Sequence, residues 1–252
     1  MQARLIESVE LAPEVRHFVF EAEGAERLDF LPGQFVSLTA PIGGKLITRA
    51  YSLASAPQRG NCFELCLNRV PDGLFSNVLF NMKSGDTVAM KPPLGMFTLR
   101  QPPRDSLFIA TGTGIAPMLA FVQHLFPDNG EDRSNSRDIW LVYGTRYETE
   151  IYYQKYFERI AAERHNFRYV STLSRAKEGW EGLRGYVQDH VARILDQRDS
   201  LNHSGALPTA AEGTGFDIHA YICGLNDMVS GNRDRLTERG WQRKQIIFER
   251  YD

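Results

Sequence analysis

The stretch Ser106-Leu-Phe-Ile-Ala110-Thr-Gly-Thr-Gly-Ile115-Ala-Pro117 decides the fold of the second half of the chain. Its first five residues form a short apolar run of the kind found in buried strands. After a short turn, residues 115–125 carry apolar side chains at helical spacing. A strand that passes so directly into a helix is typical of the first unit of a parallel sheet covered by helices.

The turn itself has the chemistry of a phosphate site. Gly112 and Gly114 let the backbone approach a pyrophosphate, and a helix N-terminus presents free N–H groups with a partial positive charge. Pro117 falls in the first helical turn, where no N–H donor is needed. We therefore expect Thr111, Gly112, Thr113, Gly114 and Pro117 to contact a dinucleotide. The alternative is a tight turn that binds nothing, since Pro117 stands where the Rossmann fingerprint has its third glycine.

Toward the C-terminus, apolar strand candidates alternate with amphipathic helix candidates. Strands are predicted over 106–110, 139–142, 168–172, 220–222 and 245–249, and helices over 115–125, 148–163, 187–195 and 228–239. This alternation predicts a C-terminal α/β nucleotide-binding domain with a five-stranded parallel sheet. Two polar stretches, 128–136 and 197–215, are predicted to be loops.

Toward the N-terminus the pattern is that of an all-β domain. Short runs of β-branched and aromatic residues predict strands over 15–21, 34–40, 63–70 and 87–91, and their spacing favours an antiparallel barrel or sandwich. One helix is predicted over 76–82, after the turn signal Pro71-Asp72-Gly73. We place the domain boundary at Pro102-Pro103, which divides the chain into residues 1–102 and 103–252.

Composition excludes several classes of function. A chain of 252 residues with 24% charged side chains and a formal net charge of -2 has no global basic field for nucleic acid or an anionic membrane. Three scattered cysteines provide neither a zinc nor an iron–sulfur ligand set, so we expect no metal. The N-terminus lacks a leader pattern, and no run reaches the roughly 18 apolar residues of a membrane span, which indicates a cytoplasmic protein.

The residues after the predicted parallel strands are suited to one ligand. Ligands of open parallel sheets lie beyond the carboxyl ends of the strands. Here those ends carry small, polar or basic residues: Tyr143-Gly144-Thr145-Arg146, Ser174-Arg175 and Cys223-Gly224. We therefore expect a dinucleotide to bind at this edge.

Three residues are candidates for selecting NADPH over NADH. A ribose 2′-phosphate requires a guanidinium fork and hydroxyl donors, whereas a free 2′-hydroxyl is usually held by an acidic residue. Ser174, Arg175 and Arg184 provide the first set. The alternative is that the two arginines are solvated surface charges.

In the first half, Arg49-Ala50-Tyr51-Ser52 is an ordinary strand sequence when taken alone. In a chain that also has a nucleotide-binding domain, this stretch indicates a second ligand site. It combines an arginine for phosphate, an aromatic plane for a ring and a hydroxyl for a ring nitrogen. Gly73-Leu-Phe-Ser76 is a second possible phosphate site at the start of a helix.

Taken in order, these motifs resemble the ferredoxin-NADP(+) reductase superfamily, and they cover nearly the whole chain. The set is completed by Pro93-Leu-Gly95-x-Phe97 and the C-terminal Glu249-Arg250-Tyr251. The resemblance implies a six-stranded antiparallel Greek-key β-barrel that binds FAD, followed by an NADP-binding α/β domain. It implies an FAD-dependent enzyme of the bacterial ferredoxin or flavodoxin reductase type.

The resemblance also implies roles for individual residues. Arg49 would hold the flavin phosphates, Tyr51 would stack on the isoalloxazine, and Ser52 would bond near its N5, with Ala50 between them. Gly73 and Ser76 would cap the pyrophosphate. The NADP side would comprise the turn residues Thr111 to Pro117, together with Arg146, Ser174, Arg175, Arg184, Cys223 and Gly224. Cys223 would lie near the nicotinamide, Glu249 would orient it or relay protons, and Tyr251 would cover the flavin; Asp252, beyond that tyrosine, receives no role.

Three functions follow from this resemblance. The first is an enzyme that exchanges a hydride with NADP(H) and single electrons with a separate small carrier, ferredoxin or flavodoxin, working as a monomer or weak dimer. The second keeps both cofactors but serves as the reductase component of an oxygenase, or reduces free flavin or quinone. The third is a nucleotide-binding regulatory module without turnover, which Ser52, Cys223 and Glu249 disfavour because such a module needs no hydride-transfer groups.

Overall fold

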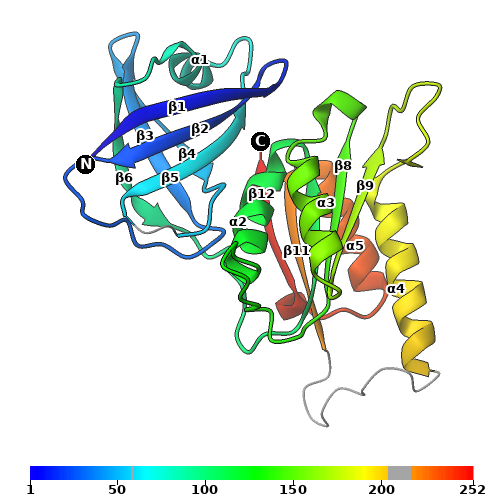
Figure 1. The fold of residues 1–252 in the computed structure, drawn as a ribbon. Coiled ribbons are helices and arrows are strands. Elements are labelled where there is room, and N and C mark those ends of the chain that lie inside the picture. The colour runs from blue at the N-terminus through cyan, green and yellow to red at the C-terminus, as the bar shows by residue number, and fades with distance from the viewer. Residues whose placement is uncertain (58–59, 204–216, 252) are drawn as a thin grey trace. The chain divides into compact units, whose positions relative to one another are not determined.

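The computed structural model describes residues 1–57, 60–203 and 217–251, which form two compact units (Figure 1). The first unit comprises Met1–Leu99 and Ile115–Arg133, and the second comprises Arg100–Gly114 and the chain from Ser134 onward. Each unit contains one six-stranded sheet. The predicted combination of an antiparallel barrel and a parallel α/β sheet is thereby confirmed.

The sheet of the first unit is antiparallel. Its strands are β1 (Gln2–Ala12), β2 (Val15–Ala22), β3 (Phe35–Ile42), β4 (Lys45–Ser52), β5 (Cys62–Asn68) and β6 (Thr87–Leu94), in the order β4-β3-β6-β1-β2-β5. Just after β4, Leu53 bridges to Leu65 on β5, and the Ala54 N–H donates to the Glu64 carbonyl at 2.8 Å. These contacts bring the two ends of the sheet together, as a closed barrel requires.

Aromatic side chains fill the barrel, and a helix packs against this core. Phe20 and Phe63 are fully buried and stack with their ring centroids 5.5 Å apart. Helix α1 (Leu74–Asn81) adds Leu79 to the same core. Helix α2 (Ile115–Leu125) also belongs to this unit, because the ring of its Phe121 lies 5.5 Å from that of Phe97.

The sheet of the second unit is parallel. Its strands are β7 (Asp105–Thr111), β8 (Ile139–Thr145), β9 (Phe167–Leu173), β10 (Leu183–Arg184), β11 (Ile218–Leu225) and β12 (Ile246–Tyr251), in the order β10-β9-β8-β7-β11-β12. The prediction of five strands is wrong by one. The additional strand, β10, pairs only two residues with β9, Leu183 with Thr172 and Arg184 with Leu173, and so short a strand leaves no periodicity in the sequence.

Helices α3 (Gln154–Glu163), α4 (Val187–His203) and α5 (Asn226–Glu238) cover this sheet (Figure 1). α4 and α5 share one core with alternate residues of the central strands, among them Leu107, Ile109 and Val142. On α3, Phe157 packs against Tyr169 of β9, with 5.3 Å between ring centroids. Short 3-10 turns cover Gly112–Gly114 (η1), Glu148–Glu150 (η2) and Arg243–Gln245 (η3).

Two predicted boundaries in this unit are wrong. The helix predicted over 148–163 consists of η2 followed by α3, because Tyr153 has a φ of 59° and interrupts the helical backbone. The loop predicted over 197–215 is helical as far as His203, since α4 continues two turns beyond its last predicted residue. The rest of that loop, like Asp252, lies outside the described residues.

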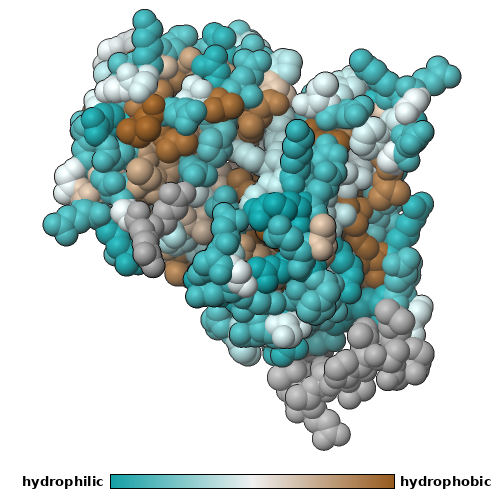
Figure 2. Space-filling model, viewed as in Figure 1, coloured by the Kyte–Doolittle hydropathy of each residue, from teal (hydrophilic) through white to brown (hydrophobic). Residues whose placement is uncertain are grey.

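β1 is an unpredicted strand, and its pattern explains why. Its inward side chains are interrupted by bulges in the pairing with β2, so strict alternation of apolar and polar residues is lost. Ile6 and Val9 of this strand are exposed, and Figure 2 shows apolar patches over this part of the first unit. Isolated exposed apolar residues of this kind are common on protein surfaces. Within the described ranges, no helix is long and apolar enough to cross a membrane.

A buried ion cluster holds α4 to the start of the sheet. Arg198, 7% exposed, donates to Asp105 on β7 at 2.8 Å and to both carboxylate oxygens of Asp217, just before β11, at 2.7 and 3.3 Å. A single guanidinium therefore bonds to two carboxylates and links α4 to both strands. Removing one member of a buried cluster leaves charges that solvent cannot fully compensate.

We expect Arg198→Met to lower the free energy of unfolding by about 2–4 kcal/mol, because it leaves Asp105 and Asp217 facing each other without a cation. Urea unfolding monitored by circular dichroism measures the change. Arg159→Met is the matched control, since the Arg159–Glu163 pair is exposed and should contribute less than about 0.5 kcal/mol. Equal losses in the two variants would contradict the importance of the buried cluster.

Candidate active site

The carboxyl ends of the central parallel strands bring the predicted dinucleotide residues together. Thr111 at the end of β7 pairs with Gly144 on β8, and Thr145 pairs with Leu173, directly before Ser174. On the other side of β7, Cys223 of β11 pairs with Ala110. Residues from four separate segments therefore meet at one edge of the sheet.

Two glycines at this edge allow the β7 turn and the end of β11 to pack closely. A Cβ on Gly114 would lie 2.3 Å from the Cys223 carbonyl oxygen, and one on Gly224 would lie 2.4 Å from Thr111 Oγ1. The contact at Gly114 is with backbone atoms, so no side-chain rotation can relieve it, whereas the contact at Gly224 is with a side chain. Gly112, in contrast, has a φ of 54° and open space beyond its Cα, as a backbone approached by a ligand requires.

A polar atom without a partner lies in this turn. Thr111 Oγ1 is buried and accepts or donates no hydrogen bond within the described part of the chain. Such orphaned atoms are rare in native structures and often mark a ligand. Together with the open space at Gly112, this atom shows that the turn fits a dinucleotide phosphate; Thr113, half-buried in η1, lies beside it.

Two guanidinium groups and a hydroxyl gather at the end of β8 and β9. The Ser174 N–H donates to the Thr145 carbonyl at 2.9 Å, and the Arg175 N–H donates to the Arg146 carbonyl at 3.0 Å. The pairing places Arg146 and Arg175 side by side, both exposed. Neither guanidinium has an ion pair or hydrogen bond to another described residue. This arrangement fits a doubly charged phosphate group.

Arg184 is placed differently from what its assignment to the 2′-phosphate requires. Its guanidinium donates to the carbonyls of Ala176, Lys177 and Trp180 at 3.1, 3.1 and 2.8 Å. The side chain is exposed, but three carbonyls already use its donors. Arg184 therefore holds the loop that follows Arg175 in shape, a role that sequence reasoning missed because the acceptors are backbone atoms.

The groups assigned to the nicotinamide end lie on β11 and β12. In the parallel register Cys223 faces Glu249 and Leu225 faces Tyr251. Cys223 is fully buried, and burial, followed by the negative charge of Glu249, raises the pKa of its thiol, whereas a hydrogen bond with the Tyr251 side chain opposes that rise. The site therefore presents a neutral thiol at physiological pH, with Glu249 and Tyr251 beside it.

In the first unit, the predicted flavin residues lie at the C-terminal end of β4. Arg49 and Ala50 are exposed, Tyr51 is half-buried and Ser52 is buried. The Tyr51 ring lies 6.0 Å from that of Phe75 on α1, and burial raises the pKa of its hydroxyl to about 12, although the charge of Arg49 acts in the opposite direction. A neutral aromatic ring fixed on one face beside an exposed guanidinium fits an aromatic cofactor that carries phosphates.

At the start of α1, polar side chains bond to nearby backbone groups. The Ser76 hydroxyl accepts the Val70 N–H at 3.0 Å, so its oxygen serves the turn before the helix. Asn77, which sequence reasoning missed, donates to the carbonyls of Gly73 and Pro71 at 2.6 and 3.1 Å. The contribution of Gly73 and Ser76 to a phosphate site therefore depends on backbone N–H groups at the helix start.

Comparison with known proteins agrees with this division of sites. Residues 2–99 match the family described as an oxidoreductase FAD-binding domain, and residues 108–234 match the oxidoreductase NAD-binding domain. Ferredoxin–NADP reductase B of Sorangium cellulosum is 36% identical, over 100% of this chain and 97% of its own length. The anthranilate 1,2-dioxygenase electron transfer component of Acinetobacter baylyi is 30% identical over 99% of this chain and 66% of its own length.

Solved structures show the same fold. A cytochrome P450 reductase from Amycolatopsis superposes with a TM-score of 0.81 at 25% identity, covering 99% of this chain and 69% of that one. A ferredoxin NADP+ reductase from Neisseria gonorrhoeae with bound FAD and NADP gives 0.76 at 23% identity, covering 99% and 98%. The chain thus belongs to the ferredoxin-NADP reductase family, as an oxidoreductase that uses FAD and NADP(H) to exchange a hydride with the nicotinamide and single electrons with a carrier protein.

Proposed function

We propose that this protein is an NADPH-dependent reductase of ferredoxin or flavodoxin, working in the cytoplasm as a monomer or weak dimer. The observation that carries the proposal is the pair of partnerless guanidinium groups of Arg146 and Arg175 beside Ser174, which suit a ribose 2′-phosphate. The relative with 36% identity is itself named a ferredoxin–NADP reductase. Three free cysteines agree with a reducing compartment.

We further propose that residues 1–102 bind FAD and residues 103–252 bind NADP(H). FAD, when bound, accepts a hydride and passes electrons on singly. In this proposal Arg49, Gly73 and Ser76 hold its phosphates, while Tyr51 and Ser52 contact its ring. Each is a local contact made by β4 or α1, so the flavin site depends on the first unit.

In the dinucleotide site the residues bind and orient. The pyrophosphate is contacted by the turn residues Thr111, Gly112, Thr113 and Gly114, and Pro117 stabilises the helical turn that follows. Gly224 lets the end of β11 lie close to Thr111 in this turn. Arg146, Ser174 and Arg175 hold the 2′-phosphate. Cys223 lies at the nicotinamide as a neutral thiol, which adds no charge where a hydride moves, and Glu249 with Tyr251 fixes its surroundings.

A second candidate is the reductase component of an oxygenase. It is favoured by the 30% identity to the anthranilate 1,2-dioxygenase electron transfer component. That relative is longer than this chain, which covers 66% of it. The two functions differ in the nucleotide preferred, so the residues around Arg175 discriminate between them.

We expect Arg175→Ala to lower the ratio of kcat/KM for NADPH to kcat/KM for NADH by about tenfold to a hundredfold. The reason is that the substitution removes charge-assisted hydrogen bonds to the 2′-phosphate. Anaerobic stopped-flow reduction of the flavin, followed near 450 nm, measures both nucleotides. Arg193→Ala is the matched control, since Arg193 is an exposed arginine on α4 and should not alter the preference. A wild-type preference for NADH would instead support the oxygenase role.

We expect Ser52→Ala to slow flavin reduction by NADPH by about tenfold while FAD stays bound, because the hydroxyl is proposed to act at the reacting edge rather than at the phosphates. Single-turnover rates and flavin content measure the two effects separately. Ser8→Ala, on β1, is the control for removing a half-buried barrel hydroxyl. Unchanged rates in Ser52→Ala would remove Ser52 from the reaction.

The raised pKa of Cys223 predicts a pH dependence of stability. The folded state keeps the thiol neutral, whereas the unfolded chain ionises it above a pH of about 8.5, so this contribution is present at neutral pH and is lost as pH rises. Between pH 7.5 and 9.5 the free energy of unfolding should fall by about 1.4 kcal/mol more in the wild type than in Cys223→Ala. Urea unfolding at the two pH values measures this difference, and Cys62→Ala, in the barrel, should retain the wild-type decline.

A further inference from the structure

The hydroxyl of Tyr143 reaches the turn that begins the dinucleotide site. Tyr143 lies on β8, its side chain is fully buried, and its hydroxyl donates to the Gly112 carbonyl at 3.1 Å. A second acceptor, the Glu150 carbonyl, lies at 3.4 Å. A hydroxyl has one proton, and the shorter bond, to Gly112, is the stronger of the two. A buried side chain of β8 therefore holds a backbone atom of the turn after β7.

The surroundings of Tyr143 fix the position of this hydroxyl. Tyr143 pairs with Ala110 on one side and with Ser171 on the other, in the middle of the parallel sheet. Its ring lies 6.4 Å from that of Tyr152. A fully buried ring can change its rotamer only by displacing close-packed neighbours. The hydroxyl is therefore a fixed point against which the turn is held.

The bond to Tyr143 decides which way the peptide between Gly112 and Thr113 faces. This peptide is trans, so its C=O and N–H groups point in opposite directions. With the Gly112 carbonyl directed at Tyr143, the Thr113 N–H is directed away from it. Thr113 is the second residue of η1, and the first N–H groups of a helix have no acceptor within the helix. The hydrogen bond thus leaves the Thr113 N–H for a ligand.

Gly112 is the residue at which this peptide can reverse. Its φ of 54° lies in the left-handed region, which glycine occupies without the steric cost of a Cβ. A reversed peptide would turn the Gly112 carbonyl oxygen toward a bound phosphate and the Thr113 N–H away from it. An anion is attracted by the first orientation and repelled by the second. The Tyr143 bond therefore favours the orientation that binds, by the worth of one hydrogen bond.

We propose that Tyr143 is a positioning residue for the dinucleotide, because its hydroxyl keeps the Gly112–Thr113 peptide in the orientation that offers an N–H to the pyrophosphate. This inference rests on the proposed function, in which the turn contacts the pyrophosphate. NADPH and NADH share that group, so loss of the hydroxyl weakens both nucleotides equally. It leaves unchanged the affinity for the 2′-phosphate, which lies at Ser174 and Arg175.

Tyr143→Phe removes the hydroxyl and keeps the ring. The concentration of NADPH or of NADH that gives half the maximal rate of flavin reduction should rise about fivefold, and by the same factor for each. The maximal rates should change less than about twofold, as expected when binding is lost equally from the ground state and the transition state. Anaerobic stopped-flow reduction over a range of nucleotide concentrations measures both quantities. Unequal losses for the two nucleotides, or no loss for either, overturn the proposal.

Tyr221→Phe is the matched control. Tyr221 is 1% exposed, lies on β11 of the same sheet, and its hydroxyl accepts the Arg100 N–H at 2.8 Å. Both substitutions remove a buried hydrogen bond, so urea unfolding should show a loss of stability in each. Only Tyr143→Phe should lower nucleotide affinity. An equal loss of affinity in the two variants is a general effect of destabilisation and overturns the proposal.

A measurement on the wild type keeps the test independent of how well Tyr143→Phe folds. Inorganic pyrophosphate is the probe, titrated into the 15N-labelled holoenzyme. The backbone amide signal of Thr113 should shift saturably, and saturating NADP+ should abolish this shift because the two compete. The absence of a saturable shift at Thr113 overturns the proposal.

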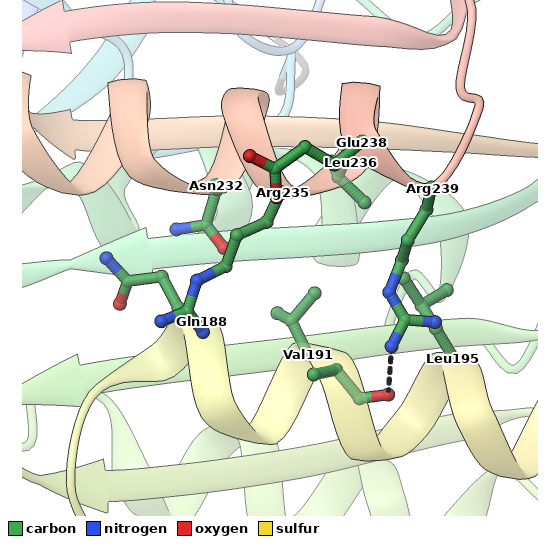
Figure 3. A pocket seen from close by; sticks show the side chains of 9 residues that line it. Gln188, Val191, Leu195, Asn232, Arg235, Leu236, Glu238 and Arg239 are labelled. Carbon is green, nitrogen blue, oxygen red and sulfur yellow. Dashed lines mark hydrogen bonds between the residues drawn. The ribbon is translucent and has the colours of Figure 1, made fainter.

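A second place where an anion could bind is the groove of about 250 Å³ between α4 and α5, whose lining residues Figure 3 shows. Arg235 and Arg239 reach into it from α5, but both already donate to aspartates of α4, at 2.9 and 2.6 Å. Gln188 and Asn232 also line the groove, and their side-chain amide signals report on it. These signals should stay unshifted. A shift there without one at Thr113 places the pyrophosphate in the groove and overturns the proposal.

Adenosine 2′-phosphate separates this inference from the proposed function, because it carries the 2′-phosphate and no pyrophosphate. Its Kd, measured by calorimetry, should be the same in Tyr143→Phe and in the wild type. A weaker Kd in the variant places the effect at the 2′-phosphate and overturns the role of Tyr143. If the wild type binds no adenosine 2′-phosphate and prefers NADH, the proposed selection of NADPH fails. A fivefold loss of NADH affinity in Tyr143→Phe then still supports the role of Tyr143.

Discussion

The contact on which the second unit depends is the close approach of two backbones at the carboxyl edge of its sheet. The turn after β7 lies so close to the end of β11 that a Cβ on Gly114 or Gly224 would overlap with atoms of the other segment. This approach brings the β7 turn, with its unpartnered Thr111 oxygen, next to the thiol of Cys223. The proposed phosphate subsite and the proposed nicotinamide end therefore share one edge of the sheet.

Much of this edge could be predicted from the sequence, because parallel strands deliver their carboxyl ends to one place whatever their exact register. Thr111, Gly144, Ser174 and Cys223 were each identified from a position just after an apolar run, and the structure brings them together. The antiparallel first unit was also predictable, although β1 was not, because bulges break its alternation. Periodicity therefore predicts regular elements well and irregular ones poorly.

The sequence could not predict which partners a side chain's hydrogen-bond donors and acceptors would have. Arg184 and Ser76 have the residue types of phosphate ligands, but their donors and acceptors are used by nearby backbone, three carbonyls in one case and the Val70 N–H in the other. Residue type indicates chemical capacity, whereas local turn geometry decides how much of it remains for a ligand. The two-residue strand β10 could not be predicted for the same reason. It is held by its pairing with β9 and by the hydrogen bonds of Arg184, and its own sequence has no strand pattern.

The distribution of arginines in the second unit follows from this point. Arg198, Arg235 and Arg239 are paired with aspartates, and Arg184 is held by carbonyls, so their charge or donors are already compensated within the fold. The backbones of Arg146 and Arg175 are joined by a hydrogen bond, and both side chains are exposed without a partner among the described residues, so their donors remain available. An anion that binds there can use these free donors, which the paired arginines of the same unit have already given to other residues.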